Sequence, residues 1–115
     1  MRILILEDDL LTALDIRNVV EDCGHQVIEM CATLAEARVH LSSDLEFAFL
    51  DIDLPDGKSF EVASALARRA VPFAFVSASV ESEIPAHLRR APFIAKPYHH
   101  AALRASLAEV LAPAC

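Results

Sequence analysis

One stretch decides the fold of this 115-residue chain: Phe47-Ala48-Phe49-Leu50-Asp51-Ile52-Asp53-Leu54-Pro55-Asp56-Gly57. Its four leading apolar residues predict a short strand buried on both faces, which ends at Asp51. The sequence Pro55-Asp56-Gly57 then marks a turn, because proline fixes φ and glycine adopts backbone angles that other residues avoid. A strand buried on both faces is typical of a parallel sheet that helices cover on either side.

Working outward from this strand, apolar runs and amphipathic stretches alternate along the whole chain. The other expected strands cover residues 3–6, 26–30, 73–76 and 93–95. The first expected helix covers about 9–23, and the second starts at a Thr33/Glu36 capping box and runs through 41. The third carries Phe60, Ala63 and Ala67 on one side, with Val62 and Leu66 beside them. The last is an amphipathic helix marked by Leu103, Leu107, Val110 and Leu111. Residues 77–92 predict only a loop or a short helix. Five alternations of strand and helix predict an open, doubly wound α/β fold.

Composition and charge exclude several classes of function. Hydrophobic residues make up 55% of the chain, enough for one sizeable core in a single domain. Ten Lys and Arg residues against 17 Asp and Glu residues give a net charge of -7, which disfavours nucleic acids and anionic membranes as partners. Gly24 and Gly57 are the two glycines. Their wide separation excludes P-loops, dinucleotide-binding fingerprints and nucleophile elbows, because each of these motifs needs closely spaced glycines.

Chemically active side chains follow the expected strands where each strand ends. Glu7 and Asp8 follow the first strand, Asp51 the third, Ser77 the fourth and Lys96 the fifth. Open α/β sheets bind ligands beyond the carboxyl ends of their strands, so these side chains should converge on one edge. Two carboxylates about 5 Å apart repel by roughly 3 kcal/mol at an effective dielectric constant of about 20, so the cluster needs a cation. Mg²⁺ suits these oxygen ligands and keeps positions for water and a phosphoryl oxygen, while Lys96 and Ser77 would contact two further phosphoryl oxygens.

Four motifs in this order resemble the receiver domain of two-component response regulators: Leu4-Ile5-Leu6-Glu7-Asp8-Asp9, Phe49-Leu50-Asp51-Ile52-Asp53-Leu54-Pro55-Asp56-Gly57, Val76-Ser77-Ala78 and Lys96-Pro97. The resemblance spans nearly the whole chain and implies a single receiver domain over residues 1–115, similar to the chemotaxis regulators. It implies a flavodoxin-like, five-stranded parallel sheet of order 2-1-3-4-5 with helices on both faces and a short or irregular fourth helix. It also implies a signalling phosphoacceptor and no ordinary enzyme, although such domains catalyse their own phosphorylation and dephosphorylation.

The resemblance assigns a role to each candidate residue. Asp51 would be the phosphoacceptor, which takes a phosphoryl group from a phosphohistidine donor with the help of Mg²⁺. The implied metal ligands are Asp8 and Asp51 directly, Glu7 mainly through water, and the backbone carbonyl of Asp53. Ser77 and Lys96 would contact the phosphoryl group. Ser77 and Phe93 would form the conformational switch, and the Lys96-Pro97 peptide bond is expected to be cis.

The fourth expected strand also resembles, in part, a subfamily of receivers with a PFxFATGY motif. In the stretch Pro72-Phe73-Ala74-Phe75-Val76-Ser77-Ala78-Ser79, the proline and both phenylalanines match and Ser77 keeps the hydroxyl group. Ala78 and Ser79 replace the glycine and the tyrosine of the motif. The short interval between Ser77 and Lys96 is consistent with the abbreviated fourth helix of that subfamily.

Two other functions compete with this interpretation. The Asp51-x-Asp53 pair is similar to the nucleophile motif of haloacid-dehalogenase-type phosphatases, but the chain has no room for their cap and no later acidic pair. A degenerate receiver could act as an interaction module without phosphorylation. That second alternative is disfavoured because the chain keeps all three carboxylates of the cluster together with Ser77 and Lys96.

The expected partners follow from the resemblance and the charge. They are a sensor histidine kinase or a phosphotransfer protein as donor and a downstream protein target, with no nucleic acid and no membrane. The expected oligomeric state is a monomer or a weak homodimer. The apolar run at residues 3–6 is too short for a signal peptide, and the uncharged run at 70–80 is too short to span a bilayer, so a cytoplasmic protein is expected.

Overall fold

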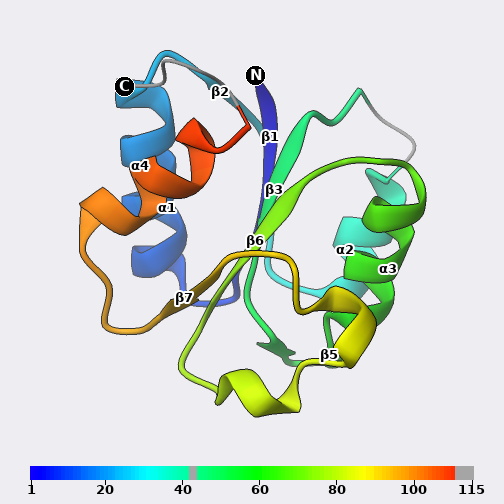
Figure 1. Ribbon diagram of the computed structural model, residues 1–115. Coiled ribbons are helices and arrows are strands. Elements are labelled where there is room, and N and C mark those ends of the chain that lie inside the picture. Colours follow the sequence, from blue (N-terminus) through cyan, green and yellow to red (C-terminus); the bar gives the residue numbers. More distant parts are fainter. Residues whose placement is uncertain (42–43, 111–115) are drawn as a thin grey trace.

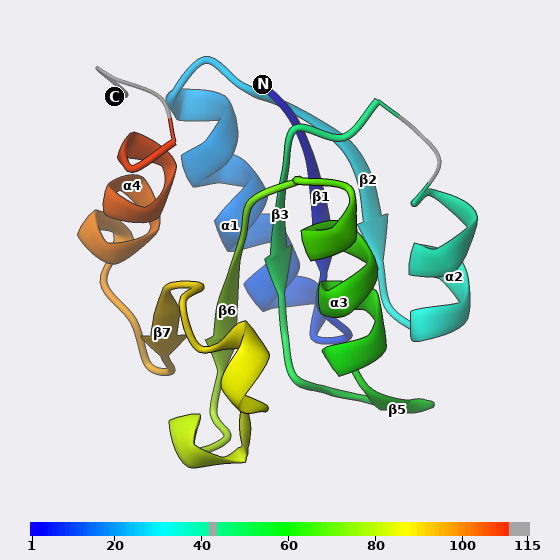
Figure 2. The ribbon, with the colours of Figure 1, turned by 45° about the vertical axis from the view of Figure 1, so that its right-hand side comes forward.

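The computed structural model describes residues 1–41 and 44–110. Its main sheet contains five parallel strands: β1 (Arg2–Leu6), β2 (Gln26–Cys31), β3 (Phe47–Leu50), β6 (Phe73–Ser77) and β7 (Phe93–Ala95). The strand order is β2-β1-β3-β6-β7, as Figure 2 shows from right to left. Once the separate hairpin of β4 and β5 is set aside, this is the order 2-1-3-4-5. The flavodoxin-like architecture predicted from the sequence is therefore confirmed.

Two helical layers enclose the sheet (Figure 1). The helices α1 (Leu10–Asp22) and α4 (His100–Ala108) cover one face, and α2 (Leu34–Val39) and α3 (Phe60–Arg68) cover the other. Neighbouring residues of a strand point to opposite faces, so Ile3 and Ile5 pack with the first pair of helices and Leu4 and Leu6 with the second. Burial on both faces explains why the central strands β1, β3 and β6 are mainly apolar runs.

A two-stranded hairpin follows β3. It consists of β4 (Asp53–Leu54) and β5 (Gly57–Lys58), where Gly57 has a φ of +136° that favours glycine. The turn at Pro55-Asp56-Gly57 was predicted, but the two short strands were not. The Asp56 carboxylate accepts hydrogen bonds from the backbone N–H groups of Leu34 (2.8 Å) and Ala35 (3.1 Å). The hairpin thus fastens the first turn of α2.

The crossover between β6 and β7 contains two short 3-10 helices, η1 (Glu81–Glu83) and η2 (Ala86–Leu88), in place of a full α-helix. This agrees with the predicted loop or short helix. Pro85 separates the two turns, and its fixed φ and missing N–H prevent one continuous helix. Ile84 and Leu88 are buried and anchor the crossover to the side of the core that α2 and α3 cover.

Three details of the predicted helices need correction or lie outside the described residues. Helix α4 ends at Ala108, and the Val110 side chain is 40% exposed, so its predicted place on the buried face is wrong. Ala67 is exposed on α3, because Val62, Ala63 and Leu66 form the buried stripe. Leu111 lies outside the described residues. Within residues 1–41 and 44–110, no helix is long and apolar enough to cross a membrane.

Candidate functional site

Three carboxylates meet at the carboxyl edge of the sheet. Glu7 and Asp8 follow β1 and Asp51 follows β3, and the pairing of Leu6 with Leu50 aligns the two strand ends. One ligand oxygen from each carboxylate lies within 4.8 Å of the others. Glu7 and Asp51 are buried, with 4% and 8% of their surface exposed, whereas Asp8 is exposed. The convergence expected from the sequence is thus observed for these residues.

Lys96 enters this cluster from the end of β7. Its Nζ lies 2.5 Å from Glu7 Oε1 and 3.3 Å from Asp51 Oδ2. Burial raises the pKa of Glu7 from 4.5 to about 7, although the hydrogen bond from Lys96 acts in the opposite direction. The lysine therefore provides one positive charge among three carboxylates, and the Lys96-Pro97 bond after it is cis, as expected.

The backbone fixes the orientation of the two buried carboxylates. The Ile52 N–H donates to Asp51 Oδ1 at 2.7 Å, and the Asp9 N–H donates to Glu7 Oε2 at 3.1 Å. Asp51 therefore has one oxygen held by the backbone and the other facing Lys96. This arrangement presents a preorganised carboxylate that can act as a nucleophile toward an anionic group once cations neutralise the pocket.

The two residues assigned to the switch lie on neighbouring strands. Ser77, at the end of β6, is almost fully buried, and its Oγ accepts a hydrogen bond from the Ser79 N–H at 3.1 Å. The Ser77 carbonyl accepts from the Lys96 N–H at 3.0 Å, which ties β6 to the lysine. Phe93 is half-buried on β7, opposite Phe75, and packs against the core between the sheet and α2 and α3.

Asp53 lies in β4, and its side chain is exposed. Its carboxylate accepts hydrogen bonds from Lys58 Nζ and from Ser79 Oγ. The hydrogen bond from Lys58 is the main cause that lowers the pKa of Asp53. Sequence reasoning missed Lys58, because the signal that places it opposite Asp53 is the pairing of two-residue strands around a turn.

The donor set fits a hard divalent cation. Glu7, Asp8 and Asp51 offer only oxygen atoms, and the exposure of Asp8 leaves the cluster open to water and to an incoming ligand. Mg²⁺ binds to proteins through few carboxylates and retains several waters. These three residues could therefore hold Mg²⁺.

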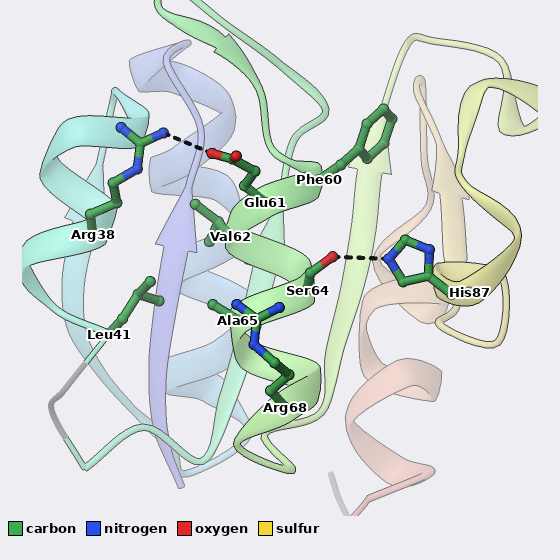
Figure 3. Close-up of a pocket in the computed structure, with 9 residues that line it drawn as sticks. All are labelled: Arg38, Leu41, Phe60, Glu61, Val62, Ser64, Ala65, Arg68 and His87. Atoms are coloured by element: carbon green, nitrogen blue, oxygen red, sulfur yellow. Dashed lines mark hydrogen bonds and ion pairs between the residues drawn. The ribbon is translucent and has the colours of Figure 1, made fainter.

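Two surface hollows lie away from this cluster. A groove of about 550 Å³ runs along α3, between α2 and η2, and a second hollow of about 490 Å³ lies near the start of β6 and the end of α4. Figure 3 shows the first, where Arg38 pairs with Glu61 and Ser64 hydrogen-bonds to His87. Neither hollow is lined by Glu7, Asp8 or Asp51.

Comparison with known proteins shows which proteins this chain resembles. No family model matches the sequence. The chain is 35% identical to the phyllosphere-induced regulator PhyR of Methylorubrum extorquens over 115 residues, which are 95% of this chain and 43% of the relative. The chain thus spans less than half the length of this curated relative.

Solved structures extend the likeness. The HemR receiver domain from Leptospira biflexa is 27% identical with a TM-score of 0.80, and the match covers 96% of this chain and 94% of that one. A CheY-like response regulator receiver domain protein from Methanospirillum hungatei is 27% identical with a TM-score of 0.79, over 94% and 90% of the two chains. Both of these structural neighbours are response-regulator receiver domains. The likeness therefore suggests a signalling domain rather than a classical enzyme, and the acidic cluster of Glu7, Asp8 and Asp51 lies at the sheet edge where the sequence predicted it.

Proposed function

We propose that this receiver domain accepts a phosphoryl group on Asp51 from a phosphohistidine of a sensor kinase or phosphotransfer protein. An oxygen of the Asp51 carboxylate attacks phosphorus, a P–O bond forms and the P–N bond to the donor imidazole breaks. The leaving imidazole keeps the bonding electron pair and takes up a proton from water. The observation that carries the proposal is the buried Asp51 carboxylate, held by the Ile52 N–H and faced by Lys96 at 3.3 Å.

In this proposal Glu7, Asp8, Asp51 and the backbone carbonyl of Asp53 hold Mg²⁺. The bound ion would reduce the repulsion between the incoming phosphoryl group and the carboxylates. Lys96 neutralises the charge on one phosphoryl oxygen. Ser77 donates a hydrogen bond to a different phosphoryl oxygen after its hydroxyl group turns. Phe93 lies on the strand next to that of Ser77 and moves when the Ser77 hydroxyl group turns. The protein-binding surface therefore differs between the phosphorylated and the unphosphorylated domain.

The proposed setting is a cytoplasmic two-component system or phosphorelay, in which residues 1–115 form one receiver domain. The output runs through a downstream protein target, because a net charge of -7 disfavours nucleic acid. A monomer or a weak homodimer is proposed as the active species. The phosphatase alternative predicts multiple turnovers on a generic phosphomonoester, whereas a phosphoacceptor releases at most one phosphate per donor event.

Incubation with acetyl phosphate and Mg²⁺, followed by intact-mass measurement, tests the proposal. We expect a single phosphate mass shift that EDTA prevents and that Asp51→Ala and Asp51→Asn abolish. Glu61→Gln is the control, because it removes an exposed carboxylate outside the acidic cluster and should leave the shift in place. Persistence of the shift in both Asp51 variants would refute the assignment of the phosphoacceptor.

A further inference from the structure

A bridge of four side chains joins the β4–β5 hairpin to the crossover that follows β6. The Asp53 carboxylate accepts from Lys58 and from Ser79, and Lys58 Nζ also lies 3.5 Å from Glu83 Oε2 in η1. We call Asp53, Lys58, Ser79 and Glu83 the Asp53 bridge. It starts two residues after Asp51, so it connects the acidic cluster with η1.

The backbone of the hairpin sets the geometry of this bridge. Asp53 and Lys58 are direct partners in the antiparallel pair of β4 and β5, which places their side chains next to each other. Ser79 is held at two points, because its N–H donates to Ser77 Oγ while its hydroxyl group donates to Asp53. The bridge therefore also reaches Ser77, the residue that faces the proposed phosphoryl group.

Polar contacts hold the η1 turn: besides the ion pair of Lys58 with Glu83, Arg89 donates hydrogen bonds to the carbonyls of Ser82 at 3.3 Å and Ile84 at 2.8 Å. Helix η1 buries none of its three residues, whereas Ile84, directly after it, is 2% exposed. Helix η2 has its own attachments, since Leu88 is buried and His87 hydrogen-bonds to Ser64. A segment with few buried contacts opens locally at low free-energy cost, so the ion pair between Lys58 and Glu83 matters more for η1 than for a packed helix.

We propose that Lys58 is a positioning residue that couples the acidic cluster to η1. It holds the Asp53 backbone at the edge of the cluster, and through Glu83 it makes η1 follow any displacement of that backbone. The coupling rests on the proposed function, because occupation of the Asp51 site supplies the displacement. This coupling connects the crossover after β6 to the Asp51 site through the β4–β5 hairpin. It is separate from the connection that Ser77 makes through Lys96 and β7.

Amide hydrogen exchange without any ligand tests the bridge itself. In Lys58→Gln we expect the amides of Glu83 and Ile84 to exchange about two- to fivefold faster, the range that the loss of an exposed ion pair gives. Lys58→Arg, which keeps the positive charge, should exchange like the wild type. Arg38→Gln is the matched control, because it removes another exposed ion pair, to Glu61 at 3.4 Å. Unchanged exchange at Glu83 in Lys58→Gln, or an equal increase in Arg38→Gln, would overturn the bridge.

A second measurement tests the coupling, with beryllofluoride and Mg²⁺ as a mimic of the phosphoryl group. In the wild type we expect NMR shifts at the amides of both Lys96 and Glu83. In Lys58→Gln the Glu83 shift should fall by about half or more while the Lys96 shift persists, and Lys58→Arg should restore it. An undiminished Glu83 shift in Lys58→Gln would overturn the coupling. The absence of any shift in the wild type would instead refute the proposed function, and exchange would still decide whether the bridge exists.

Discussion

Replacement of Lys96 by methionine should destabilise the domain by about 2–3 kcal/mol at neutral pH without Mg²⁺. At 2.5 and 3.3 Å and an effective dielectric constant of about 20, the two ion pairs of Lys96 are worth roughly 7 and 5 kcal/mol of Coulomb energy. Desolvation offsets much of this attraction. Removal of one partner of a buried pair nevertheless costs about 3–5 kcal/mol, because the other charge stays behind. The expected loss of unfolding free energy in Lys96→Met is smaller than this, because the Lys96 side chain is 21% exposed and water can solvate the carboxylates in its place.

Urea unfolding of a double-mutant cycle measures this loss. The cycle compares the wild type, Lys96→Met, Glu7→Gln and the double variant, and we expect a coupling free energy of at least about 1 kcal/mol. Lys58→Met is the matched control, because it removes a lysine whose side chain is 48% exposed and should cost clearly less than Lys96→Met. A Lys96→Met variant within about 0.5 kcal/mol of the wild type, or a coupling of zero, would refute the view that Lys96 neutralises the buried carboxylates.

Three further predictions concern neighbouring residues. Asp8→Ala should raise the urea midpoint in EDTA, because it removes one of three clustered carboxylates, and should weaken Mg²⁺ binding about tenfold or more in an NMR titration; equal affinity would contradict the ligand role. Asp56→Ala should lower the melting temperature at pH 7, and the difference should vanish in acid. The hydrogen bond from the Leu34 N–H is the first cause that lowers the pKa of Asp56 below 3.8, so its contribution is present above the unfolded-state pKa and is lost as the pH falls through the folded-state value; a difference that does not change with pH would contradict this. Gly57→Ala should cost about 1 kcal/mol or more in urea unfolding, because φ is +136° and a Cβ would lie 3.3 Å from Leu34 Cδ1; an unchanged midpoint would show that the hairpin relaxes.

The sequence predicted the sheet well because both faces of the central strands β1, β3 and β6 are buried and the edge strands are still largely apolar. The runs at 47–50 and 93–95 coincide with β3 and β7, and the end of β3 placed Asp51 at the site. Strand ends of a parallel sheet lie at one edge, so the convergence of Glu7, Asp8, Asp51 and Lys96 also followed from the order of the motifs.

Contacts between exposed polar side chains could not be predicted in the same way. The Asp56 cap on α2 joins residues 22 positions apart, and no periodic pattern marks it. Lys58 reaches Asp53 only because β4 and β5 pair, and strands of two residues are too short for an alternation to register. The error at Val110 has a different origin, because the apolar spacing continues past Ala108, where α4 ends.

Chemical trapping of the phosphorylated residue tests the central claim most directly. After reaction with acetyl phosphate and Mg²⁺, borohydride reduces an aspartyl phosphate to homoserine, and peptide mass spectrometry then identifies the changed position. The account predicts homoserine at position 51 and unmodified aspartate at positions 8 and 53. Homoserine at position 8 or 53 with Asp51 intact, or a phosphate mass shift that leaves no homoserine after reduction, would contradict it.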